Sequence, residues 1–132
     1  MGGTPSNNLT PRRHFIMTTI SKDNKLVTLI NVFTVEPDKQ QQLVDLLIHA
    51  TNVAMCHIPG FISANIHRSL DGTKVANYAQ WRSVEDFRAM LKNPAALPHM
   101  QQAAALAKFE HGLYEVVETH SHDPSAERSQ NT

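Results

Sequence analysis

Two side chains with chemical potential, Asn77 and Trp81, lie four positions apart in a segment that alternates like a β-strand. Side chains an even number of positions apart on a strand point to the same face, so the amide and the indole share one face. Val75 and Ala79 fall on that face too, and both are small enough to leave room beside the larger groups. The pattern therefore places a polar amide next to an aromatic ring with space around them.

Asn31 occupies a comparable position on an earlier strand, where it shares a face with Leu29 and Phe33. An amide among large apolar side chains must find a hydrogen-bond partner or meet a ligand, because leaving it unpaired costs about 1–3 kcal/mol. Two interpretations stay open from the residues alone. Asn31, Asn77 and Trp81 could line an apolar pocket with a few fixed polar groups. Alternatively, both amides bond neighbouring backbone and the indole is part of the core.

His67 joins or leaves this group according to the length of the hairpin loop at Asp71-Gly72. A two-residue loop places His67 opposite Ala76 and away from Asn77. A three-residue loop places it opposite Val75, on the Asn77 face, where an imidazole could exchange a proton with a ligand near neutral pH. The Asp-Gly pair permits both loops, and a surface histidine at a hairpin end is the competing interpretation.

The remaining candidates carry weaker signals. His120 and His122 form a pair near the C-terminus without a third ligand close by, so no metal site is expected. Cys56 has no base beside it in the sequence and is expected to pack against a helix rather than to act as a nucleophile. The sequence has no phosphate-binding glycine loop, no Gly-x-Ser-x-Gly elbow and no His-Glu-x-x-His motif. Phosphoryl transfer, acyl transfer and nucleotide redox chemistry are therefore not indicated.

Composition bounds the class of protein. The 132 residues suffice for one domain, and 12 basic residues balance 12 acidic ones, which argues against a nucleic-acid partner. No apolar run approaches the roughly 20 residues that a membrane helix requires. No secretory signal is recognised, and a single cysteine fits a reducing compartment, so a cytoplasmic location is expected.

Periodicity predicts a folded unit over residues 25–119, preceded by a disordered segment or extension over 1–24 and followed by a flexible tail over 120–132. Ser83, followed three residues later by Asp86, predicts the start of the second helix with a reciprocal cap, and Asn93-Pro94 interrupts that helix. The predicted elements, in chain order, are a strand over 26–35, a helix carrying the stripe from Leu43 to Ala54, strands over 61–69 and 73–81, a helical segment to about Lys108, and a strand over 113–119.

This β-α-β-β-α-β order predicts an α+β, ferredoxin-like fold, with an antiparallel four-stranded sheet and helices on one face. Both faces of the sheet carry apolar side chains, however. Ile30 and Val32 alternate with Leu29 and Phe33 on the first strand, and residues 62, 64 and 66 are expected to oppose Phe61 on the second. Because one set of helices covers one face only, the other face is expected to pack against the sheet of a second copy, as in a homodimer.

The run Pro59-Gly60-Phe61, then His67, Asp71-Gly72-Thr73 and the block from Asn77 to Trp81 with Ser83, resembles the antibiotic biosynthesis monooxygenase superfamily. The resemblance covers about residues 26–119 and is greatest to the cofactor-independent anthrone and quinol monooxygenases. It implies a dimeric α/β-barrel assembly of ferredoxin-like domains. It also implies that the protein needs neither metal nor cofactor, and that it oxidises an electron-rich aromatic such as a phenol, hydroquinone or anthrone to a quinone with O2.

Roles are implied by position. Asn77 and Trp81 would take part in substrate deprotonation and oxygen activation, and His67 would line the same pocket as a catalytic residue. A tyrosine that holds the substrate in these enzymes is replaced here by Phe87, which removes a hydroxyl donor and keeps the ring. The residues expected to bind substrate are Asn31, Phe33, Phe87, Met90 and His99.

Three other functions compete. A second branch of the superfamily degrades haem, but its tryptophan would fall on Met90 and its iron-ligating histidine near His99 or Met100, one position out of register. A non-catalytic dimer could bind a small aromatic or lipid-like ligand, since fold alone does not fix function. An isomerase or detoxifying enzyme acting on a small carbonyl compound is the third. A free Asn77 amide that points into space would favour an oxygenase, and one tied to backbone would favour a scaffold.

Overall fold

The computed structural model describes residues 17–125 of the chain. Four strands and three α-helices follow one another in the predicted order, with the second predicted helix divided in two at Asn93-Pro94. The elements are β1 (Val27–Thr34), η1 (Pro37–Lys39), α2 (Gln40–Val53), η2 (Met55–His57), β2 (Phe61–Arg68), β3 (Lys74–Trp81), α3 (Val84–Leu91), α4 (Leu97–Leu106) and β4 (Lys108–Tyr114). None of the described helices is long and apolar enough to cross a membrane.

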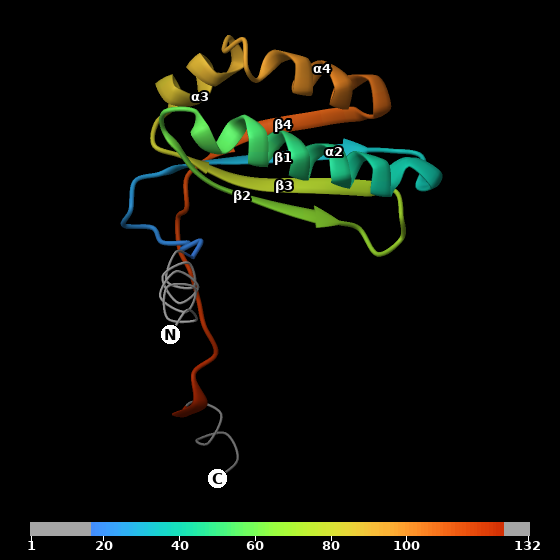
Figure 1. The fold of residues 1–132 in the computed structure, drawn as a ribbon. Coiled ribbons are helices and arrows are strands. Elements are labelled where there is room, and N and C mark those ends of the chain that lie inside the picture. Colours follow the sequence, from blue (N-terminus) through green and yellow to red (C-terminus); the bar gives the residue numbers. More distant parts are fainter. Residues whose placement is uncertain (1–16, 126–132) are drawn as a thin grey trace, which may run out of the picture.

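The strands form one antiparallel sheet in the order β2-β3-β1-β4, and all three α-helices lie on the same side of it (Figure 1). This arrangement confirms the ferredoxin-like prediction. Two clusters of buried side chains fill the space between sheet and helices, one around Trp81 and Met90 and one around Leu43 and Val75. The sheet bounds the interior on one side and is called the floor below, and the three α-helices bound it on the other side and are called the roof.

Polar side chains in the turn fix the register of the β2–β3 hairpin. The Ser69 N–H donates a hydrogen bond to the carbonyl of Lys74 at 2.9 Å. The Ser69 hydroxyl accepts hydrogen bonds from the N–H groups of Thr73 and Lys74. The Asp71 carboxylate accepts from Ser69 Oγ and from Thr73, and these bonds lower the pKa of Asp71 to about 2. The resulting pairing sets His67 opposite Ala76, as the two-residue alternative predicts.

A sharp turn at Gly60 leads the chain into β2. Gly60 has a φ of 87°, and its carbonyl accepts a hydrogen bond from Arg82 N–H at 2.8 Å. A Cβ atom at this position would lie 2.4 Å from the Cβ of Asp86, so the close approach requires glycine. Asp86 is held there by Arg82 and by Ser83, whose hydroxyl caps α3 by accepting from Asp86 N–H at 3.1 Å. The predicted cap on the second helix is present through this bond.

Strand β2 differs from the expectation because it contains a bulge. Phe61 pairs with Trp81, but Ser63 and not Ile62 pairs with Gln80, so the register shifts by one residue between positions 61 and 63. Ala64 therefore lies on the same face as Phe61, whereas Ile62 remains 46% exposed. The prediction that residues 64 and 66 oppose Phe61 is wrong, because strict alternation holds only in a strand without an extra residue.

The last strand is also displaced from its predicted place. β4 runs from Lys108 to Tyr114 and pairs with β1 along its whole length, whereas residues 115–119 form no strand. The apolar alternation of residues 113–119 therefore does not mark the strand, because β1 pairs with the segment over residues 108–114. This correction moves Phe109 and His111 from the predicted connection between helix and strand into the sheet.

Part of the N-terminal segment contacts the outer face of the sheet, the face opposite the helices. Gln80, 2% exposed, donates from Nε2 to the carbonyl of Thr19 at 2.8 Å, and Thr18 Oγ1 donates to Asn65 Oδ1. Thr18 and Thr19 were expected to lie outside the folded unit. Residues 1–16 and 126–132, which hold most of the predicted extension and tail, lie outside the described residues.

Comparing Gly60→Ala with Gly72→Ala measures how much stability depends on the close approach between Gly60 and Asp86. Both glycines have a φ near 85° (87° and 84°), so alanine is strained at either position by about 1–3 kcal/mol. Only at Gly60 would the added Cβ collide with a neighbour, since at Gly72 the nearest atom is 3.8 Å away. We expect Gly60→Ala to lower the urea midpoint of unfolding more than Gly72→Ala does. Equal midpoints in the two variants would contradict the role given to the Asp86 contact.

Candidate active site

The helix-facing side of the sheet is built in rows of paired residues, and the sizes of these residues create a cavity. At one end Trp81 pairs with Phe61, and at the other Phe33 pairs with Phe109. Between these aromatic ends lies a row of smaller side chains that includes Ala79 and Ala64. Large residues at both ends with alanines between them leave a hollow of about 230 Å³, just below the roughly 300 Å³ at which ligand pockets usually begin.

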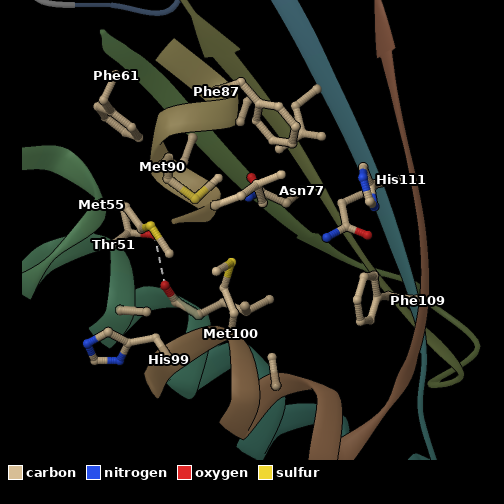
Figure 2. A pocket seen from close by; sticks show the side chains of 18 of the residues that line it. Thr51, Met55, Phe61, Asn77, Phe87, Met90, His99, Met100, Phe109 and His111 are labelled. Atoms are coloured by element: carbon tan, nitrogen blue, oxygen red, sulfur yellow. Dashed lines mark hydrogen bonds between the residues drawn. The ribbon is translucent and has the colours of Figure 1, made fainter. Parts of the chain in front are cut away.

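A polar row crosses the floor of this cavity. Asn77 on β3 pairs with Asn31 on β1, and Asn31 pairs in turn with His111 on β4. Paired residues on one face of antiparallel strands have Cβ atoms about 4.5–5.5 Å apart, so the three side chains stand next to one another. All three line the cavity, and Figure 2 shows Asn77 and His111 together on the sheet side of it.

Several polar atoms that line the cavity have no hydrogen-bond partner in the described part of the chain. They are Oδ1 of Asn31, Oδ1 of Asn77, Nε1 of Trp81 and Nδ1 of His99. Each is buried, and a buried polar atom without a partner costs about 1–3 kcal/mol. The alternative in which both amides bond neighbouring backbone is therefore not met at their Oδ1 atoms, whereas Trp81 does belong to a core cluster, as that alternative expects. Unpaired donors and acceptors around a hollow are available to a ligand.

Trp81 is fixed in place by rings from two directions. It is 2% exposed, with Phe61 at 5.7 Å and Phe87 at 6.3 Å between ring centroids, both in edge-to-face geometry. Such pairs contribute about 0.5–1.5 kcal/mol beyond their buried area. The indole therefore presents one fixed edge to the cavity, and Phe87 occupies the place that the resemblance gives to tyrosine.

The roof is apolar and rich in sulfur. Met90 on α3, Met55 on η2 and Met100 on α4 all line the cavity, as labelled in Figure 2. Thr51 on α2 contributes a hydroxyl, but that hydroxyl donates to the carbonyl of Leu47 at 2.8 Å and is already satisfied. Methionine side chains are flexible and polarisable, so they can adapt to the outline of a planar ligand.

The structure brings seven of the eight predicted site residues to this cavity. They are Asn77, Trp81, Asn31, Phe33, Phe87, Met90 and His99. His67 does not line it. It pairs with Ala76, lies exposed on the outer face, and its Nδ1 is 3.0 Å from the carbonyl of Asn65. The interpretation that joins His67 to the Asn77 face is wrong, because the four-residue connection between Ser69 and Lys74 gives the hairpin the other register.

His111 is the site residue that sequence reasoning missed. The sequence pattern places the last strand at residues 113–119, which leaves His111 outside it, and no ligand-type spacing links His111 to another histidine. The available signal was the alternation of Phe109, His111 and Leu113 directly after the alanine-rich helix. The ring of His111 lies 6.0 Å from that of Phe87 and stacks on Phe109 at 6.1 Å, so two aromatic rings flank it.

Metal binding has little support in the described residues. No group of three or more histidine, cysteine or carboxylate side chains there is placed to hold a metal ion. The cavity contains two histidines and no carboxylate, and its other polar groups are amides, an indole and one hydroxyl. These groups can orient a ligand, stabilise an anion by hydrogen bonding and exchange a proton.

Comparisons with known proteins identify relatives of this chain. A curated relative, tetracenomycin-F1 monooxygenase of Streptomyces glaucescens, is 48% identical over 92 residues, which cover 70% of this chain and 82% of the relative. A second, deoxynogalonate monooxygenase of Streptomyces nogalater, is 31% identical over 94 residues, covering 70% of this chain and 78% of the relative.

Solved structures show the same fold. The monooxygenase ActVA-Orf6 of Streptomyces coelicolor, in complex with nanaomycin D, superposes with a TM-score of 0.68 at 25% identity, covering 76% of this chain and 95% of the other. SnoaB, a cofactor-independent oxygenase of Streptomyces nogalater, superposes with a TM-score of 0.65 at 28% identity, covering 71% and 95%. The sequence profile of the antibiotic biosynthesis monooxygenase family matches residues 26–106. With this match and the curated relatives, the chain belongs to the antibiotic biosynthesis monooxygenase family.

Proposed function

We propose that this protein is a cofactor-independent monooxygenase that oxidises an electron-rich polycyclic phenol or anthrone to a quinone with O2. The observation that carries the proposal is that Oδ1 of Asn77 and Nε1 of Trp81 are buried in the lining of an apolar cavity and have no hydrogen-bond partner among the described residues. A scaffold protein gains nothing from leaving these atoms unsatisfied. A binding site for a ring system with hydroxyl and carbonyl groups gives each of them a partner.

The proposed chemistry begins with loss of a proton from the bound aromatic. The carbanion or phenolate that results is the electron-rich species that can pass an electron to O2. The Oδ1 atoms of Asn77 and Asn31 can accept hydrogen bonds from substrate hydroxyl groups, whereas their Nδ2–H groups and the Nε1–H of Trp81 can donate to a substrate oxyanion. Hydrogen bonds that are already oriented in a water-poor cavity stabilise a developing anion without reorganisation, and one such donor contributes about 10²–10³-fold to kcat.

Phe87 bears on which substrates fit. The resemblance places a substrate-holding tyrosine here, and the phenylalanine ring is 4% exposed between Trp81 and His111. It can stack on a planar substrate but cannot donate a hydrogen bond. We propose that orientation in this protein depends on the polar row of the sheet floor, which the ring of Phe87 faces across the cavity.

Loss of the Asn77 amide tests this proposal. We expect Asn77→Ala to lower kcat for oxygen uptake about a hundredfold with an anthrone such as dithranol, because the anion loses a hydrogen-bond partner. Trp81→Phe should lower it as well. The matched control is Asn65→Ala, which removes an asparagine from the same hairpin on the outer face, where it bonds the carbonyl of Tyr78. The measurement is oxygen-electrode turnover with a metal chelator present. Turnover at the wild-type rate in both cavity variants would refute the site.

A second copy of the chain is the proposed partner of the outer sheet face. Ile30 and Val32 on β1 and Tyr78 on β3 lie there and are only partly buried in the single chain. Strands with apolar side chains on both faces are typical of sheets that are covered on both sides. We therefore propose a homodimer that packs sheet against sheet.

Charge placed on the outer face tests the dimer. Ile30→Asp should yield a monomer in sedimentation velocity, because a carboxylate buried between two sheets without a partner is costly. Thr34→Asp, at the exposed end of the same face, is the control and should stay dimeric. A wild-type protein that sediments as a monomer at micromolar concentration would overturn the assembly.

Haem degradation is the competing activity that a simple titration separates. Met90 stands where that branch would place its tryptophan, and Figure 2 shows His99 extending from α4 toward α2, away from Asn77. A cavity of about 230 Å³ also favours a ligand of a few rings over a macrocycle. We expect no shift of the Soret band when haem is added to the protein. A saturable shift with one haem per chain that His99→Ala abolishes would favour the haem branch.

A further inference from the structure

Two side chains that line the cavity carry a basic group. They are His99 and His111, and every other lining residue described is apolar or carries an amide, an indole or a hydroxyl. Because the first step of the proposed function is removal of a proton, and His67 lies on the outer face, one of these two imidazoles is the candidate acceptor.

The two histidines occupy different walls. His99 projects from α4 toward α2, where its ring meets that of His49 edge-on at 6.0 Å. His111 stands on the sheet floor in the row that contains Asn31 and Asn77. Neighbouring strands are about 4.8 Å apart, so the backbones at His111 and Asn77 are separated by roughly 9 to 10 Å, with Asn31 between them. A planar ligand bound over Asn31 therefore reaches both ends of the row.

We infer that His111 is the catalytic base of this site. The inference rests on the proposed function and adds a named proton acceptor to it. Its position suits the role in a second respect, because His111 lies on the edge strand β4 and is exposed to solvent on one side while Phe87 and Phe109 flank its ring. An imidazole between an apolar cavity and water can take a proton from a ligand and later return it.

With an anthrone as substrate, the proposed reaction removes two protons from the methylene carbon and reduces one molecule of O2. His111 takes one proton from the methylene carbon, and the carbanion transfers electrons to O2 as a carbon–oxygen bond forms. The peroxide anion takes the proton back from His111. The same imidazole then removes the second proton from that carbon, a carbonyl forms as the oxygen–oxygen bond breaks, and the departing hydroxide takes the proton to become water. The methylene carbon is oxidised to a ketone, and O2 supplies one oxygen atom to the ketone and one to water.

The test separates proton removal from oxygen chemistry by using dithranol with and without O2. In aerobic solution we expect His111→Ala to lower kcat at least about a hundredfold with little change in KM, and added imidazole to restore part of the loss. Under anaerobic conditions, at a pH where free dithranol is neutral, wild type should produce the longer-wavelength absorption of the anion and His111→Ala should not. His67→Ala, on the outer face, should behave as wild type in both assays. Imidazole rescue also shows that the variant is folded.

The other possible results separate the role of His111 as base from the oxygenase function. If His111→Ala keeps wild-type kcat while Asn77→Ala loses activity, the inference is overturned and the proposed function stands. If His99→Ala, rather than His111→Ala, loses the anaerobic anion and regains it with imidazole, His111 is not the base. If wild type forms the anion through His111 but consumes no oxygen, the base assignment stands and the oxygenase function fails. If wild type does neither, both are refuted.

Discussion

Strand β1 lies between β3 and β4, and its hydrogen bonds to both neighbours hold Asn31 opposite Asn77 on one side and opposite His111 on the other. The polar floor of the cavity depends on this double pairing. Because side chains alternate along a strand, a slip of one residue on either side would turn a whole set of lining groups to the outer face. The β1–β3 register also fixes Phe33 and Trp81 at opposite ends of the cavity, so the hollow and its polar row are specified together.

The cavity keeps polar atoms where packing alone would favour apolar ones. Within residues 17–125, one buried polar atom on each of four lining residues has no hydrogen-bond partner, namely on Asn31, Asn77, Trp81 and His99. Natural interiors pair the large majority of buried side-chain polar atoms. Several exceptions around one hollow are what the proposed binding of a polar aromatic ligand requires. The second cluster of buried side chains, around Leu43 and Val75, is made of apolar residues.

Much of the fold could be predicted from short-range patterns. Period-two alternation placed Asn77 and Trp81 on one face, Ser83 with Asp86 located the start of α3, and Asn93-Pro94 separated α3 from α4. These features depend on local backbone geometry and need no knowledge of the partner strand.

The parts that could not be predicted depend on pairing between distant segments. The hydrogen bonds of Ser69 and Asp71 set the hairpin register and turned His67 outward, although the Asp-Gly pair alone permits either loop. β1 selected residues 108–114 as its neighbour over the equally alternating residues 113–119, which brought His111 into the site. A single-residue shift in β2 likewise has no signature in composition, since any residue can occupy a bulge of this kind.

That bulge has a consequence for anyone who wishes to move this site to another protein. The extra residue near Ile62 allows Phe61 to stay against Trp81 while Ala64 keeps its place over the hollow. A recipient sheet with four regular strands could carry every lining residue in the right order and still present Phe61 to the wrong side. Grafting the chemistry therefore requires copying an irregularity of the backbone as well as a list of amino acids.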